Sequence, residues 1–376
     1  MKIHLLLSLG ILLTFAGCKK DDPEEPTGSS PTVDCPENSA LDEIENRNFE
    51  MGFTTWPYDA TVESVDNTYD FLSNNGSIYC EHLDNRIPWD ALINDTSLPD
   101  AYVNDVQGRV NNAPVGLDFL LTVSILNNDR SDLIEDYAGN IPEYENLNDP
   151  EIAEAYTEHL TYLINQLNPD YLVMSLESNE LLINSPEKWD SYKLLMAEVR
   201  SEINSQFPGL PISESMTLHN WFSPDIADPQ SYIDEISNYV TNFDFTAVSF
   251  YPYFKGLSTE SEFQTAFDFL HSQTSSPIAF VETAHLAENL EVENLNLSIA
   301  SDECEQNDYL ETLMLNAQEH DYEFIIWWAH RDFDALWETL PPETQDLAKI
   351  WRDTGLLDED GNERPAIHTW SEMLQK

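Results

Sequence analysis

Basic residues are scarce in this sequence, which contains 16 Lys and Arg against 70 Asp and Glu and carries a formal net charge of −54 at pH 7. Binding to nucleic acid is not expected, because the phosphate backbone requires positive charge. Tight binding of heavily sulfated or carboxylated polymers is also disfavoured, unless a basic group lies in the cleft that binds them. An acidic surface of this kind keeps a protein soluble in a saline environment.

Glycine is also scarce, with 12 residues in the whole chain and no Gly-x-Gly-x-x-Gly motif. This absence argues against an open doubly wound sheet, which carries a glycine-rich loop after its first strand. No Gly-x-Ser-x-Gly motif supports a nucleophilic serine. The apolar run near the N-terminus, residues 5–15, is too short to cross a bilayer as a helix.

That N-terminal run is typical of an export signal. Lys2 gives a positive start, and Phe15-Ala-Gly-Cys18 resembles a bacterial lipobox. We therefore expect residues 1–17 to be a lipoprotein signal peptide and Cys18 to carry lipid, the alternative being a plain secretory signal with an incidental cysteine. Residues 18–36 are acidic and rich in Ser and Pro, which indicates a flexible tether. Its acidic stretch resembles the surface-export signal of Bacteroidetes lipoproteins, which implies the outer face of the outer membrane.

Three cysteines remain besides Cys18. An exported protein can form disulfides, and Cys35 and Cys304 are the expected pair because both lie in polar, loop-like sequence. Cys80 lies in an apolar segment and is interpreted as a packing residue. No cysteine spacing resembles a zinc site, and we expect neither a metal nor a cofactor.

After the tether, strand-like and helix-like segments alternate over residues 37–376, which indicates parallel strands joined by helices. Eight such units predict a closed (β/α)8 TIM barrel of the α/β class, a single domain that we expect to be a monomer. Strand alternation assigns Trp327 to the core and Trp328 to the barrel mouth. The predicted strands are residues 51–55, 77–81, 117–125, 171–176, 212–218, 246–251, 278–281 and 324–328.

Two glutamates follow strands that are far apart in the sequence. Glu180 ends the fourth predicted strand segment and Glu282 the seventh. Since strand C-termini of a barrel converge on one mouth, the two carboxyl groups are expected to meet there. Cleavage of a glycosidic bond with retention requires such a pair, a protonated acid/base and an ionised nucleophile. Glu177 lies near the same strand end and competes with Glu180 for the acid role, but it lacks the preceding Asn.

Other strand ends carry groups suited to binding a sugar. Asn179 is predicted to bond the sugar 2-hydroxyl, Tyr251 to donate its hydroxyl to Glu282, and Arg86 to keep Glu282 ionised. The remaining predicted substrate-binding residues are aromatic or polar residues near strand ends: Trp56, Trp89, His219, Asn220, Trp221, His285 and Trp328.

Asn179-Glu180 and Glu282 make the sequence resemble clan A, the retaining β-glycosidases built on β/α-barrels. Leu176-Glu-Ser-Asn-Glu180 is close to the family 5 cellulase pattern. Val248-Ser-Phe-Tyr-Pro-Tyr253 and Phe280-Val-Glu-Thr-Ala284 are most similar to glycoside hydrolase family 53, the endo-β-1,4-galactanases. The resemblance implies Glu180 as acid/base and Glu282 as nucleophile.

We therefore predict a surface-anchored retaining endo-β-glycosidase that cleaves a plant or marine polysaccharide, with β-galactan as a candidate substrate. Its partners would be that polysaccharide and, through Cys18, the membrane. The alternative, of a different class, is a catalytically silent barrel that binds glycan for a polysaccharide uptake system. Whether loops close one end of the cleft and make the enzyme exo-acting stays open.

Overall fold

The computed structural model describes residues 35–36 and 39–376. The predicted signal peptide, the lipidation site at Cys18 and most of the predicted tether lie outside the described residues. Within the described residues, no helix combines the length and apolar character needed to cross a membrane.

The core of the fold is a sheet of nine parallel strands in the order β5-β4-β3-β2-β1-β11-β8-β7-β6. β5 and β6 are two pieces of one barrel strand separated by Glu214, so the ends of this order meet and eight strands close a barrel. All eight predicted strands and the predicted fold are confirmed. The strand bounds are β1 (Glu50–Thr54), β2 (Ile78–Leu83), β3 (Asp118–Val123), β4 (Tyr171–Val173), β5 (Ile212–Ser213), β6 (Ser215–Thr217), β7 (Thr246–Phe250), β8 (Ile278–Thr283) and β11 (Phe324–Trp327).

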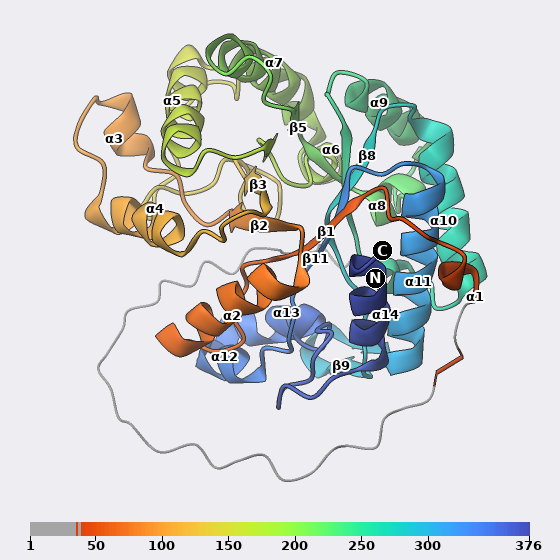
Figure 1. The fold of residues 1–376 in the computed structure, drawn as a ribbon. Helices are drawn as coiled ribbons and strands as arrows, with labels where there is room; N and C mark the ends of the chain where they lie inside the picture. Colours follow the sequence, from red (N-terminus) through yellow and green to blue (C-terminus); the bar gives the residue numbers. More distant parts are fainter. Residues whose placement is uncertain (1–34, 37–38) are drawn as a thin grey trace.

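Helices surround the strands on the outside of the barrel (Figure 1). Local sequence sets several of their ends: Asp149 caps α5 ahead of Pro150, and Thr259 and Glu262 form a capping box at α10. The helix bounds are α1 (Ser39–Asp42), α2 (Val62–Asn75), α3 (Trp89–Ile93), α4 (Asp100–Asn112), α5 (Pro150–Leu167), α6 (Asn179–Asn184), α7 (Trp189–Gln206), α8 (Leu218–Phe222), α9 (Pro229–Val240), α10 (Glu260–Gln273), α11 (Glu303–Glu319), α12 (Asp334–Thr339), α13 (Pro342–Arg352) and α14 (Pro365–Leu374). Three 3-10 turns, η1 (Pro186–Lys188), η2 (Pro252–Lys255) and η3 (Glu293–Leu295), and a hairpin of β9 (Leu290–Val292) and β10 (Leu297–Ile299) complete the described structure.

Side chains fill the barrel rather than leaving a pore. Residues that alternate along the strands point inward and form an apolar cluster separate from the one between strands and helices. Gly52 on β1 is needed here, because a Cβ at this position would lie 1.8 Å from the carbonyl oxygen of Ile78. Trp327 points outward into the core and donates to Thr354 O at 2.9 Å, whereas Trp328 lies at the mouth, which confirms their predicted division.

A disulfide between Cys35 and Cys304 attaches the N-terminal segment to the first turn of α11, and it confirms the predicted pairing. α1 lies beside α11 (Figure 1). Cys80 is a free, buried cysteine inside the barrel, as predicted.

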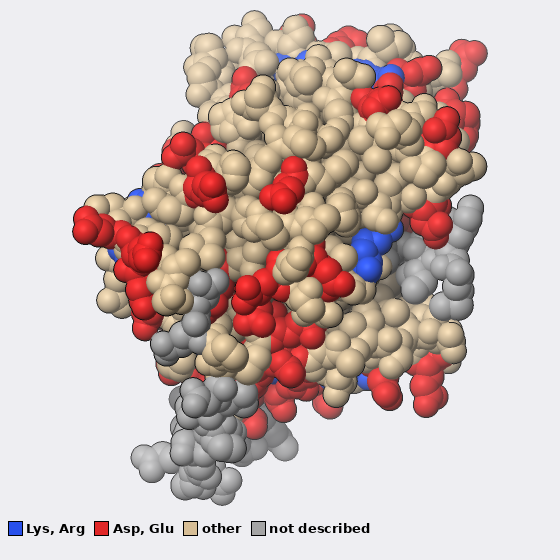
Figure 2. Space-filling view, turned by 90° about the vertical axis from the view of Figure 1, so that its right-hand side faces the viewer, with Lys and Arg blue, Asp and Glu red and all other residues tan. Residues whose placement is uncertain are grey.

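The acidic composition is visible on the surface. Figure 2 shows the side of the molecule on the right of Figure 1, where carboxylates are spread widely and basic side chains are few. The few basic side chains on this side form no broad basic face.

Candidate active site

Glu282 lies near the end of β8, and its side chain is buried. The pairing of β8 with β7 shifts in register just before Glu282. The Tyr251 hydroxyl donates a hydrogen bond to Glu282 Oε1, as the sequence suggested. His82 Nδ1 lies 3.5 Å from Glu282 Oε2. Burial raises the pKa of Glu282, and the positive charge of His82 and the Tyr251 hydroxyl oppose that rise.

His82 points into the mouth from β2 and is held between two carboxylates. Its Nε2 lies 3.6 Å from Asp84 Oδ2, and its ring meets Trp328 edge-on with ring centroids 5.7 Å apart. Burial lowers the pKa of His82, but Asp84 and Glu282 outweigh it and the net pKa lies well above the usual value. This shift favours the protonated, cationic form of His82 beside Glu282.

Arg86, which was predicted to hold Glu282 ionised, is not placed there. Its Nε and Nη2 donate to Glu135 Oε1 at 3.0 and 2.8 Å. His82 takes the position expected for this arginine. The sequence contained a signal for this inward position, because His82 continues the alternation of the inward-pointing Ile78 and Cys80 along β2.

Glu180 lies in the first turn of α6 rather than on β4. Thr217 Oγ1 and Asn220 Nδ2 donate hydrogen bonds to Glu180 Oε1, the second at 2.7 Å. No described group bonds Oε2, which leaves that oxygen for a substrate. Burial raises the pKa of Glu180, while Thr217, Asn220 and the charge of Lys255 lower it.

Glu177 is a third carboxyl group at the mouth. Its backbone has φ of +53°, a left-handed conformation that is uncommon for residues other than glycine and typical of constrained functional sites. Arg130 Nη2 lies 3.2 Å from Glu177 Oε2. Burial raises the pKa of Glu177 to about 8 against the effect of Arg130, and the charges of Glu282 and Glu180 add to the rise.

Asn179 is buried and its amide is occupied by the protein. Its Oδ1 accepts from Thr217 N at 2.8 Å, and its Nδ2 donates to the Tyr232 hydroxyl at 2.7 Å. These bonds fix the start of α6 and thereby the direction of Glu180. They leave little capacity for the predicted contact with a sugar 2-hydroxyl.

The structure divides the other predicted binding residues into two groups. Trp89 and Trp221 are fully buried and bond Ile134 O and Ser237 Oγ, so they pack in the core. His219 and His285 are buried as well, and burial lowers their pKa values to about 3 and about 4, so both are neutral. Trp56 and Trp328, in contrast, lie together near His82 with ring centroids 5.1 Å apart. Asn220 contacts Glu180, as described above.

Several buried polar atoms at the mouth have no hydrogen-bond partner among the described residues. They include His82 Nδ1, Glu177 Oε1, Arg130 Nε, Trp56 Nε1 and Trp328 Nε1, while other atoms of this kind, such as Arg364 Nε and Gln306 Oε1, lie elsewhere in the protein. Buried polar groups are normally satisfied, and those that are not call for a specific explanation. Sugar hydroxyls, which both donate and accept, can satisfy atoms of this kind.

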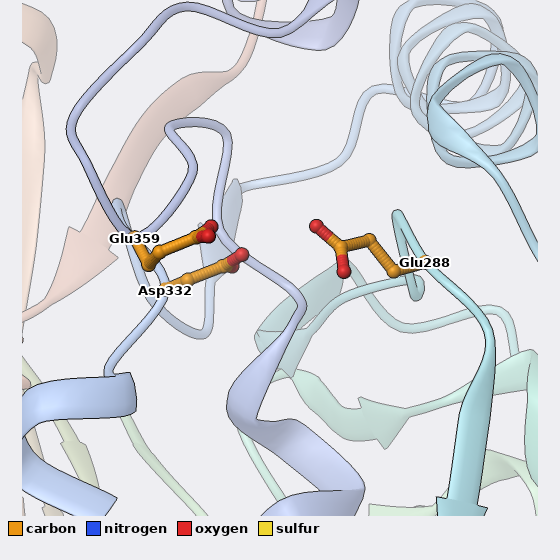
Figure 3. A group of neighbouring side chains, drawn as sticks. All are labelled: Glu288, Asp332 and Glu359. Atoms are coloured by element: carbon orange, nitrogen blue, oxygen red, sulfur yellow. The ribbon is translucent and has the colours of Figure 1, made fainter.

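Among the described residues, two groups of acidic side chains could hold a metal ion by their geometry: Asp332, Asp334 and Asp353, and also Glu288, Asp332 and Glu359, the three that face one another in Figure 3. A protein cation already lies among them. Arg364 Nη2 is 2.7 Å from Asp332 Oδ2 and 2.8 Å from Glu288 Oε1. The Arg364 guanidinium thus already pairs with two of these three carboxylates.

The model of glycosyl hydrolase family 53 matches residues 153–368, which include Glu177, Glu180 and Glu282. This chain belongs to glycosyl hydrolase family 53. It is therefore a glycoside hydrolase, as the sequence predicted, and the resemblance to clan A is confirmed. No curated protein sequence matches the chain significantly.

Solved structures of related barrels share the fold of this family 53 protein. The GH5_18 structure from Bifidobacterium longum subsp. longum is 17% identical, with a TM-score of 0.62 over 87% of this chain and 79% of the other. The GH53 catalytic domain of Ignisphaera aggregans is 15% identical, with a TM-score of 0.54 over 89% of this chain and 93% of the other. GH5_18-E153A from Streptomyces cattleya, solved in complex with Manb1-4GlcNAc, is 15% identical with a TM-score of 0.61 over 87% of this chain and 80% of the other.

Proposed function

We propose that this family 53 protein is a retaining endo-β-glycosidase, with Glu282 as nucleophile and Glu180 as acid/base. The observation that carries the proposal is the environment of Glu282. A buried carboxylate lies between a hydroxyl donor and a histidine whose protonated form is favoured, in a mouth where several buried polar atoms lack partners. A hydroxyl-rich ligand fits this mouth, and the pair His82 and Tyr251 favours the ionised, nucleophilic state of Glu282.

The reaction would proceed in two displacements. In the first, Glu282 attacks the anomeric carbon, the bond to the leaving oxygen breaks, and Glu180 gives its proton to that oxygen. In the second, Glu180 takes a proton from water, the water attacks the anomeric carbon, and the bond to Glu282 breaks. Burial supports the first step, since the raised pKa of Glu180 keeps a larger fraction of this carboxyl group protonated.

Three further elements of the proposal rest on the sequence. The first is a polysaccharide substrate, with β-galactan as the candidate from the family 53 motifs. The second is a lipid anchor at Cys18, and the third is location on the outer face of the outer membrane. The lipobox-like residues before Cys18 and the acidic tether after it support the second and third elements.

The test is a product assay of the mature protein against β-galactan, β-glucan, β-mannan and marine polysaccharides, with Glu282→Gln and Glu363→Gln variants alongside. Glu363 is an exposed glutamate far along the chain, so its variant controls for the loss of one charge. We expect wild type and Glu363→Gln to release oligosaccharides from one polymer, and Glu282→Gln to release none. Binding to a polymer without release by wild type would instead support the silent glycan-binding barrel.

A further inference from the structure

Lys255 differs from every other basic residue that the structure describes. Each of the other described Lys and Arg side chains makes a hydrogen bond, an ion pair or a ring contact, for example Lys193 with Glu235 and Arg331 with Tyr58. No such contact to a described residue exists for the Lys255 ammonium. In a chain with 70 acidic residues against 16 basic ones, a lysine without a carboxylate partner is unexpected.

Lys255 lies at the barrel mouth and not on the outer surface. It ends the η2 turn, which begins directly after Tyr251, the hydroxyl donor to Glu282. Gly256 follows with φ of +65° and closes the turn. The side chain is partly buried, and the charges of Glu180 and Asp225 raise its pKa.

Partial burial has a cost for this ammonium group. Burial lowers the pKa of Lys255, and Glu180 and Asp225 only oppose that effect without forming an ion pair. A charge that loses water without gaining a partner is unfavourable in the free protein. An anion that arrives with the substrate would recover that loss, and charge-assisted hydrogen bonds are the stronger ones.

The η2 turn contacts α8, whose Asn220 donates to Glu180, so Lys255 lies on the Glu180 side of the mouth. The acid/base must reach the glycosidic oxygen that it protonates. A cation beside the acid/base is therefore within reach of substituents on the sugars that flank the scissile bond. We propose that Lys255 forms a subsite for an anionic substituent, a carboxylate or a sulfate ester, on a sugar next to the bond that is cleaved. This inference rests on the proposed function, because it places the substituent relative to Glu180.

The strongly negative net charge does not exclude such a ligand. Charges on the surface are screened over about 8 Å at physiological ionic strength, and over less in saline water. The attraction that matters is between groups in contact, where Lys255 has no competing ion pair. Arg130 and His82, the other cations of the mouth, are already held by Glu177 and by Asp84 with Glu282.

The experiment uses the full mature protein and one β-glycan in three forms: unmodified, oxidised at C6 to the uronate, and sulfated. The glycan is the one that wild type cleaves, or β-galactan if none is cleaved. The variants are Lys255→Met, Lys255→Arg and, as a matched control, Lys193→Met on α7. We expect Lys255→Met to lower kcat/KM on at least one anionic form by about 10- to 100-fold, mainly through KM. Activity on the unmodified form should stay within about threefold, Lys255→Arg should retain the anionic preference, and Lys193→Met should behave as wild type.

The outcomes separate the sources of the anion and the alternatives. Loss confined to the uronate or to the sulfated form identifies the substituent. Equal loss on all three forms would mean that Lys255 acts on Glu180 alone, and no loss on either anionic form would mean that there is no subsite; both overturn the inference. Binding of the same polymers to Glu282→Gln and to Glu282→Gln/Lys255→Met, measured by calorimetry, gives a readout without turnover. If wild type cleaves nothing, the proposed function fails, while weaker anionic binding in the double variant would still support the subsite.

Discussion

Two regions of this molecule bury carboxylates beside cations, and they do so in different ways. Around Arg364, the guanidinium Nη1 and Nη2 donate to both oxygens of Asp332 at 3.0 and 2.7 Å, and Gly355 N adds a bond at 2.8 Å. At the barrel mouth, the contacts are longer: His82 lies 3.5 Å from Glu282 and Arg130 lies 3.2 Å from Glu177. In the first region both oxygens of the buried carboxylate are hydrogen-bonded, whereas in the second Glu177 Oε1 has no partner among the described residues.

The difference shows how a structural charge cluster can be told from a functional one. Both regions contain strongly raised carboxyl pKa values, about 8 for Asp332 and about 8 for Glu177, and burial is the main cause in each. A perturbed pKa alone therefore does not mark the active site. The bonding of the carboxyl oxygens separates the two regions better, because both oxygens of Asp332 are bonded whereas Glu177 Oε1 has no described partner.

The largest effect is expected at the mouth, from removal of the acid/base. Glu180→Gln should lower kcat/KM on a polysaccharide by about 10²- to 10⁴-fold, because the leaving oxygen no longer receives a proton. On an aryl glycoside with an activated leaving group, the first step should be nearly unchanged, which a pre-steady-state burst would reveal. Glu177→Gln serves as the matched variant three residues away. If Glu177→Gln and not Glu180→Gln shows this dependence on the leaving group, the acid/base is Glu177.

A smaller effect, on stability rather than activity, is expected at the Arg364 cluster. Arg364→Met leaves the buried Asp332 without its cation and should lower the free energy of unfolding by about 3–5 kcal/mol. Denaturant unfolding measures this, with kcat/KM of the folded variant close to wild type. A variant of full stability that had lost activity would reverse the roles assigned to the two regions.

The disulfide, like the Arg364 cluster, lies outside the mouth, and its removal is expected to change stability rather than activity. Cys35→Ser should lower the free energy of unfolding by about 2–4 kcal/mol, since the link constrains the unfolded chain. Cys304→Ser should match it, and the double variant should add little because both changes remove the same bond. Activity at low temperature should be retained in all three. An additive loss in the double variant would show that one cysteine contributes through packing instead.

The smallest effect is a shift in pH dependence. A protonated His82 favours the ionised form of Glu282, so His82→Gln should raise the pKa of Glu282. The acidic limb of the kcat/KM profile, which reports ionisation of the nucleophile, should move to higher pH by about one unit. Arg86→Gln is the control, because Arg86 contacts Glu135. An acidic limb that stays in place in His82→Gln would show that His82 does not act on Glu282.

Sequence alone predicted the parts of the fold that local rules determine. Asp149 followed by Pro150 sets the start of α5, and the capping box of Thr259 and Glu262 sets the start of α10, so both starts are determined by local sequence. The disulfide followed from the polar surroundings of Cys35 and Cys304, and strand alternation separated Trp327 from Trp328. These inferences need no knowledge of distant contacts.

The orientation of side chains at the mouth could not be predicted in the same way. The left-handed backbone at Glu177 follows a strand of only three residues, so extrapolating the alternation of β4 does not give the direction of Glu177 or Glu180. Arg86 pairs with Glu135, and Trp89 and Trp221 pack in the core. Their hydrogen-bond partners lie elsewhere in the sequence, so a local pattern does not reveal them. Lys255 belongs to no recognisable sequence motif. Only the structure shows that its ammonium group has no hydrogen bond or ion pair with a described residue.

The link between Cys35 and Cys304 also constrains how the enzyme could meet an insoluble or cell-bound polymer. Cys304 lies in the first turn of α11, which follows the loop after β8, so the link is on the side of the barrel where the strands end and the mouth opens. With lipid at Cys18, 17 residues (35 − 18) separate the anchor from this point, and a fully extended chain of that length reaches at most about 60 Å. If Cys18 is lipidated as proposed, the mouth would be confined to that distance from the bilayer, and a polysaccharide substrate would have to come within it before being cut.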